Sequence, residues 1–207
     1  MTEHAATPAP SANPFDQGYF DSEDLRRFGF KSVGANVRIA RNATIIGLRN
    51  IALGENIRID DHVVIACHAG SLELGNHIHI AGGCYLGCAG GIRLADFTGL
   101  SQGVRVYSGT DDYSGKSLTN PTVPHQYLKL SIARVTLEKH VIVGSGSVIL
   151  PGVTIGEGSC VGALSLVTKS LESWGVYFGS PVKRLRSRSK NLLELEKMLI
   201  EEETANP

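Results

Sequence analysis

The sequence lacks the features that mark nucleic-acid binding, membrane insertion and secretion. Its 207 residues carry 20 basic and 20 acidic side chains, so no excess of positive charge is available to bind nucleic acid. No apolar run is long enough to span a bilayer. The N-terminal stretch MTEHAATPAPSANPF lacks the basic and apolar regions of a signal peptide. We therefore expect a cytoplasmic protein with no membrane span and no nucleic-acid partner.

Cysteine is also scarce, with 4 residues in the whole chain. They are Cys67, Cys84, Cys88 and Cys160, irregularly spaced and without a CxxC pair. This pattern predicts free thiols in a reducing compartment, and it argues against both a disulfide framework and a zinc site made from cysteines.

What the sequence does have is a six-residue repeat. From Leu137 to Val167 every sixth residue is aliphatic, the residue four places later is small or β-branched in all repeats but the last, and glycine often follows the aliphatic residue. The same repeat occurs upstream in groups of three. The aliphatic positions are Val33, Ile39, Ile45, Leu53, Ile59, Ile65, Leu74, Ile80, Leu86, Leu94, Leu100, Val106, Leu137, Val143, Ile149, Ile155, Val161 and Val167.

The spacing of these groups predicts a triangular coil. Three hexads complete one turn, and the turns tolerate short insertions between them and one long insertion before Leu137. Each hexad supplies a short strand and a corner, and the aliphatic side chains stack inward at the ~4.8 Å spacing of neighbouring strands. Asn36, Asn56 and Asp60 suit sharp corners. Ordinary antiparallel strands alternate with period two instead. We predict an all-β fold, a parallel β-helix of about six coils.

The remaining segments flank or interrupt this β-helix. We assign residues 1–19 to an N-terminal arm, 20–32 to a capping helix, 33–173 to the β-helix and 174–207 to an extension with a C-terminal helix. Asp21 or Ser22 is the expected N-cap of the first helix. The insertion at 112–134 predicts a long projecting loop, and long loops are usually functional. The C-terminal helix is amphipathic, and its leucine stripe packs on either its own or a neighbouring subunit.

Two stretches carry a resemblance to a known family. The sequences GCYLGCAGGIRLADFTGLSQGVRVYSGTDDYSGKSLTNPTVP and KHVIVGSGSVILPGVTIGEG resemble the hexapeptide-repeat acyltransferases, in particular the sugar acetyltransferases of O-antigen and capsule gene clusters. The resemblance covers about residues 20–186 and implies a left-handed β-helix, a homotrimer with sites between subunits, and acetyl-CoA as co-substrate. It implies an N-acetyltransferase acting on a nucleotide-linked 4-amino-4,6-dideoxy sugar, such as GDP-perosamine or a dTDP-4-amino sugar. The alternatives are a sugar O-acetyltransferase and a non-catalytic β-helix scaffold.

Acyl transfer to an amine requires a group that takes a proton and a donor that stabilises the oxyanion. The catalytic candidates are His140, Asp112 and Asp111. His140 follows the loop, and a neutral imidazole suits a base near pH 7. The aspartates stand where the sugar O-acetyltransferases of the family carry their catalytic histidine. A carboxylate can pair with a sugar ammonium, which favours the amine as acceptor.

The family's projecting loop helps to enclose its site, so the substrate-binding candidates are His125, Asn120 and Tyr127, together with His79 from a middle coil. Family coenzyme A lies along the last coils, with basic residues beyond them meeting its phosphates. The matching positions are Gly144, Ser145, Gly162, Ala163, Thr168, Lys169, Lys183, Arg184 and Arg186. The amide of Gly144 or Gly162 is a candidate partner for the thioester oxygen.

A metal site is not expected. Histidines 62, 68, 77 and 79 invite comparison with the trimeric β-helix carbonic anhydrases, which bind zinc. Their spacings of six, nine and two do not match the pair of histidines five apart in those enzymes, and zinc requires three or four converging ligands.

Overall fold

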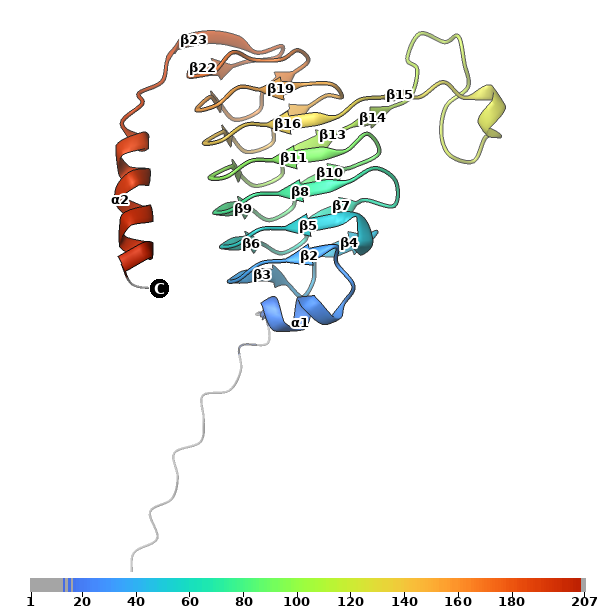
Figure 1. Cartoon of the computed structure of the whole chain (residues 1–207). Coiled ribbons are helices and arrows are strands. Elements are labelled where there is room, and N and C mark those ends of the chain that lie inside the picture. Colours follow the sequence, from blue (N-terminus) through green and yellow to red (C-terminus); the bar gives the residue numbers. More distant parts are fainter. Residues whose placement is uncertain (1–12, 14, 16, 206–207) are drawn as a thin grey trace, which may run out of the picture.

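The computed structural model describes residues 13, 15 and 17–205. Its body is a three-sided prism, and each side is a sheet of mostly parallel strands, which we call sheets A, B and C (Figure 1). The chain runs repeatedly from sheet B to sheet A, then to sheet C, and back to sheet B. We name the corners by these passages: the B/A corner, the A/C corner and the C/B corner. The predicted parallel β-helix is confirmed.

Each of six coils contributes one strand to each sheet, and sheet A contains three further strands. Sheet A contains β1 (Tyr19–Phe20), β3 (Val37–Ala40), β6 (Ile57–Ile59), β9 (Ile78–Ile80), β12 (Gly99–Leu100), β17 (Ile142–Val143), β20 (Cys160–Val161), β22 (Gly175–Phe178) and β23 (Lys183–Ser187). Sheet B contains β2 (Ser32–Val33), β5 (Ile51–Leu53), β8 (Leu72–Leu74), β11 (Ile92–Leu94), β16 (Val135–Leu137) and β19 (Thr154–Ile155). Sheet C contains β4 (Thr44–Ile46), β7 (Val64–Ala66), β10 (Tyr85–Gly87), β13 (Arg105–Tyr107), β18 (Val148–Ile149) and β21 (Leu166–Val167).

The hexad aliphatics form the core, as the repeat requires. Ile39, Ile59, Ile80, Leu100 and Val143 are buried and lie one above the other in sheet A. Because every strand is parallel to its neighbours in the adjacent coils, each core side chain packs on its counterpart one turn away. Aliphatic side chains therefore fill the interior of the described prism, and a ligand must bind on its outside.

The stack is longer than the hexads predict. Strand β22 adds a seventh parallel strand to sheet A by pairing with β20, with Val161 opposite Tyr177. Three full hexads after Val161 would end two positions beyond Tyr177, the residue that pairs with Val161. The hexad pattern therefore does not include this strand. Strand β23 then pairs antiparallel with β22.

Both ends of the prism carry additional elements. Helix α1 (Ser22–Arg27) begins at Asp21, whose side chain accepts hydrogen bonds from the amides of Glu23 and Asp24. Ahead of it, β1 pairs antiparallel with β3. The predicted N-terminal arm lies mostly outside the described residues. Helix α2 (Leu192–Ala205) runs beside the coils on the side opposite the projecting loop (Figure 1). Short 3-10 turns span Leu48–Asn50 and His125–Tyr127.

The projecting loop leaves the prism at the C/B corner. It starts and ends with a two-residue antiparallel ladder, β14 (Gly109–Thr110) against β15 (Ser131–Ile132). An isolated bridge between Leu118 and Leu128 connects its two outer limbs. The loop therefore stands away from the prism as an ordered arm (Figure 1).

Candidate active site

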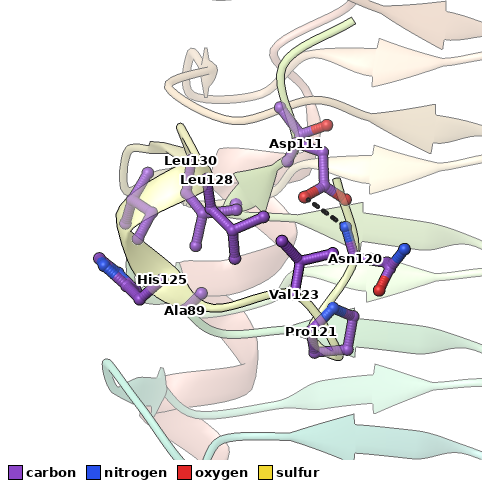
Figure 2. Close-up of a pocket in the computed structure, with 11 residues that line it drawn as sticks. Ala89, Asp111, Asn120, Pro121, Val123, His125, Leu128 and Leu130 are labelled. Carbon is purple, nitrogen blue, oxygen red and sulfur yellow. Dashed lines mark hydrogen bonds between the residues drawn. The ribbon is translucent and has the colours of Figure 1, made fainter. Parts of the chain in front are cut away.

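The projecting loop and the prism enclose a pocket of about 560 Å³ (Figure 2). Three of its residues, Asp111, Asn120 and His125, are among those predicted from the sequence. The rest of the lining is mostly apolar and comes from Ala89, Gly109, Thr110, Pro121, Val123, Leu128, Leu130 and Ile132. A few polar groups facing an apolar wall are typical of small-molecule sites.

The two adjacent aspartates have different roles in this pocket. Asp111 lines it, and its carboxylate accepts a long hydrogen bond of 3.4 Å from the amide of Asn120. Asp112 instead closes a turn by accepting hydrogen bonds from the Ser114 amide and hydroxyl and from the Ser117 hydroxyl. The Ser114 hydrogen bonds lower the pKa of Asp112. Of the two, Asp111 is therefore the carboxylate that a ligand in the pocket would meet.

The apolar wall is the part of the site that the sequence interpretation did not include. Leu128, Leu130 and Ile132 all line the pocket. Their alternation at every second position is the mark of an extended segment with one apolar face, and this signal was present in the loop sequence. Tyr127, predicted for this site, lines a second hollow of about 600 Å³ on the outer part of the loop.

His140 lies away from this pocket, at the B/A corner. It continues a column of residues with left-handed backbone, Asn36, Asn56, His77 and Phe97. Its ring stacks on Phe97 at 5.0 Å, and its Nε2 lies 2.8 Å from Glu196 of helix α2. The side chain is 7% exposed. Within one chain the structure does not bring His140 together with Asp111.

His79 belongs to a separate cluster on the outer face of sheet A. Its Nε2 lies 2.8 Å from Asp60, which also accepts hydrogen bonds from Tyr19 Oη at 3.1 Å and Arg58 Nε at 2.6 Å. Burial acts to raise the pKa of Asp60, but the hydrogen bonds from His79, Arg58 and Tyr19 outweigh it and lower the pKa. Asp60 is thus a carboxylate that orients His79, whose side chain is 51% exposed.

The predicted coenzyme A positions fall into three places. Gly144, Ser145, Gly162 and Ala163 lie at the A/C corner, Thr168 and Lys169 follow β21, and Lys183, Arg184 and Arg186 are exposed along β23. The amides of Gly144 and Gly162 donate to the carbonyls of Val161 and Tyr177. These two amides are therefore engaged between coils and are not free to bind a thioester oxygen.

The described part of the chain has neither a metal-binding cluster nor a membrane-spanning helix. No group of three or more His, Cys, Asp or Glu side chains in that part is arranged to hold a metal ion. No helix of the same part is long and apolar enough to cross a membrane.

The chain forms a prism of six-residue repeats, with a projecting loop beside a pocket. Hexapeptide acyltransferases have this architecture, and sequence comparison assigns the chain to the same family. Residues 134–169 match the family Bacterial transferase hexapeptide (six repeats). The chain is 41% identical over 178 residues, 86% of its length and 93% of the relative's, to the dTDP-4-amino-4,6-dideoxy-D-glucose acyltransferase of Escherichia coli. The chain belongs to the hexapeptide-repeat acyltransferases.

Comparison with solved structures shows a similar fold with known ligands. AntD, an N-acyltransferase from Bacillus cereus solved with dTDP and 3-hydroxybutyryl-CoA, superposes with a TM-score of 0.86 at 39% identity, covering 91% of this chain and 99% of that one. A variant of AntD holds dTDP-4-amino-4,6-dideoxyglucose and coenzyme A. The galactoside O-acetyltransferase of Lactococcus lactis is 36% identical over 118 residues, 53% of this chain and 54% of that enzyme.

Proposed function

We propose that this protein transfers an acyl group from coenzyme A to the amino group of a dTDP-linked 4-amino-4,6-dideoxy sugar. One observation carries the proposal. The likeness to the Escherichia coli sugar acyltransferase extends over 86% of this chain, whereas the likeness to the galactoside O-acetyltransferase extends over 53%. The dTDP-linked acceptor is one of the nucleotide sugars predicted from the sequence.

The loop pocket offers the chemistry that this reaction requires. The acceptor is an ammonium in water and must lose a proton before its nitrogen attacks the thioester carbonyl. Asp111 is a carboxylate at a largely apolar wall, where it can pair with that ammonium and take the proton. The apolar side chains, Leu128 among them, match the methyl group of a 6-deoxy sugar. The transfer needs no covalent enzyme intermediate, because positioning supplies much of the rate.

The donor assignment rests on the basic residues beyond the last coil. Lys183, Arg184 and Arg186 are exposed along β23, where a guanidinium or ammonium can pair with the phosphates of coenzyme A. The acyl group is acetyl or a short hydroxyacyl chain, such as the one that AntD binds. We further propose a homotrimer in the cytoplasm, supplying an acylated sugar for O-antigen or capsule synthesis.

The proposal is tested by offering the purified protein dTDP-4-amino-4,6-dideoxyglucose and GDP-perosamine, each with acetyl-CoA and 3-hydroxybutyryl-CoA. Release of free thiol reports turnover, and mass spectrometry locates the new amide. We expect the dTDP sugar to be acylated on nitrogen. An ester on a hydroxyl group would support a sugar O-acetyltransferase instead. If the protein neither turned over nor bound coenzyme A, the non-catalytic β-helix scaffold would be the remaining alternative.

A further inference from the structure

Gly99 in β12 has no structural reason to be glycine. Its φ is not positive, and an added Cβ would meet only Ile142 Cγ1, at an ordinary 3.8 Å. Other strand glycines make room for the fold itself: a Cβ on Gly87 would lie 3.1 Å from Tyr85, and one on Gly175 would lie 2.3 Å from Tyr177. A glycine inside a strand destabilises it and often marks a close approach by a ligand or another chain.

The space above Gly99 is a small groove on the outer face of sheet A. It measures about 120 Å³ and is lined by His79, Ala81, Gly99, Leu100, Ser101, Gln102 and Ile142. Gly99 pairs in register with His79 on one side and Ile142 on the other. The groove is therefore the gap in an outward-facing row of side chains where one side chain is missing. Its size suits one edge of a sugar ring rather than a whole nucleotide sugar.

The row is basic on the N-terminal side of the gap. His79 pairs in register with Arg58, and Arg58 with Arg38. Both guanidinium groups lie within 6 Å of the Tyr19 ring, at 5.7 and 5.9 Å. Neighbouring strands are ~4.8 Å apart, so the arginines lie one and two strand spacings beyond His79. A diphosphate attached to a sugar ring in the groove would extend past His79 toward these two arginines.

The other side of the gap leads toward the proposed donor path. Ile142, 45% exposed, offers an apolar surface. Gln102 lines the groove and accepts a hydrogen bond of 3.3 Å from Ser145 Oγ. Ser145 belongs to the A/C corner assigned to coenzyme A. Along this face the basic side chains come first, the groove second and the A/C corner third. The diphosphate, the sugar and the acyl group follow one another in the same order in the reacting complex.

We propose that the groove at Gly99 receives the sugar ring of the nucleotide-linked acceptor, with its diphosphate on Arg38 and Arg58. This inference rests on the proposed function and adds a second surface to the acceptor site. His79, held by Asp60, forms the wall between ring and diphosphate. The outer face of sheet A and the loop pocket then take part in one reaction when a neighbouring subunit brings its loop to this face.

The decisive variant is Gly99→Ala, because the added methyl group has room in the fold but fills the groove. We expect its melting temperature to equal or exceed that of the wild type, since a strand glycine is removed. We expect the KM for the dTDP-amino sugar to rise about tenfold or more, the usual effect of one methylene in a close-fitting pocket. The KM for the acyl-CoA should stay the same. Ala52→Val, at an outward position of β5 in sheet B, is the matched control and should leave both KM values unchanged.

A second variant tests the diphosphate. Arg38→Ala should raise the KM equally for dTDP- and GDP-linked amino sugars that the enzyme accepts, and should weaken inhibition by dTDP. A lower melting temperature with unchanged KM and inhibition would show that Arg38 only packs on Tyr19. That result would overturn the assignment of the diphosphate to Arg38. Wild-type turnover with an unaltered acceptor KM in Gly99→Ala, or an increase confined to the acyl-CoA KM, overturns the groove. A wild type that acylates no amino sugar removes the proposed function itself.

Discussion

At the scale of single residues, the corner column explains what His140 does in this structure. Five successive coils place Asn36, Asn56, His77, Phe97 and His140 at the same corner with φ between 51 and 63°. Asn36 donates a 2.7 Å hydrogen bond to Asn56, and the rings of His77 and Phe97 stack at 4.5 Å. His140 adds another stacked ring and a hydrogen-bonded contact with Glu196. These contacts are those of a structural side chain.

The first prediction compares His140→Asn with Asp111→Asn. Asparagine tolerates left-handed backbone, so His140→Asn should fold, lose about 1 kcal/mol of stability with the contact to Glu196, and retain wild-type kcat. Asp111→Asn should keep its melting temperature and lower kcat about 100-fold, the usual contribution of a general base. Steady-state kinetics and thermal melts measure both. A collapse of kcat in His140→Asn, with Asp111→Asn fully active, would return the role of base to His140.

At the scale of elements, helix α2 is attached to the prism mainly through charged groups. Glu196 pairs with Lys139 and with His140, and Glu203 lies 3.7 Å from His77. A hollow of about 250 Å³ separates the helix from the coils beside these pairs. Leu195 and Met198 stay exposed. The helix therefore carries an uncovered apolar surface, which agrees with packing on a neighbouring subunit as one of the two options predicted from the sequence.

The second prediction concerns the pH dependence of this attachment. Burial acts to raise the pKa of Glu196, but Lys139 and His140 outweigh it and lower the pKa below the ordinary 4.5. A carboxyl group with a lowered pKa in the folded state stabilises it above its unfolded pKa, and this stabilisation is lost as the pH falls through the lower folded value. We expect the protection factors of the α2 amides, which correct for the slower intrinsic exchange at low pH, to fall as the pH drops below 4.5.

Glu196→Gln should make α2 exchange fast already at neutral pH, at a cost of about 1 kcal/mol for the lost ion pairs. Glu194→Gln is the control, because Glu194 pairs within its own helix, with Lys197. Hydrogen exchange measured by mass spectrometry separates α2 from the prism. Equal protection of α2 in Glu196→Gln and the wild type would show that apolar contacts, rather than Glu196, hold the helix.

At the scale of the whole molecule, the outer faces of sheets A and B differ. Sheet B carries ion pairs between coils, Arg134 with Glu73 and Arg93 with Glu138, which is typical of a solvent-facing surface. Beyond the charged row of Arg38, Arg58 and His79, sheet A and the A/C corner expose apolar side chains, with Ile142 at 45% and Leu164 at 79%. Exposed apolar surface often marks a protein interface, and these side chains agree with the proposed trimer.

The third prediction tests that assembly directly. Light scattering on the purified protein should give three times the 22.1 kDa of one chain. Leu164→Asp should shift the mass toward one chain, because a charge buried in an interface without a partner is costly, while circular dichroism keeps its β-helix signal. Glu73→Gln on sheet B is the control and should stay trimeric. A wild-type mass of one chain would remove the trimer from the proposal.

The sequence by itself determined the prism, since hexads with inward aliphatics that recur in groups of three predict three strands per turn. It also determined the projecting loop, which interrupts the hexads, and the two helices outside them, which the N-cap residues and the C-terminal leucine stripe indicate. It left out the last parallel strand, β22, because Tyr177 follows Val161 two positions too soon for three full hexads. Among the residues that line the loop pocket, it proposed Asp111 from its place in the family's coil, and Asn120 and His125 from their place in the loop.

Only the tertiary structure decided which of these side chains meet. Residues at one corner or on one outer face are far apart in the chain yet one strand spacing apart in space, so their contacts depend on the register of every insertion between them. That register put His140 under helix α2 and away from Asp111. It also placed Gly99 between His79 and Ile142. A glycine looks ordinary in a glycine-rich repeat, and its empty surroundings become visible only when the coils are stacked.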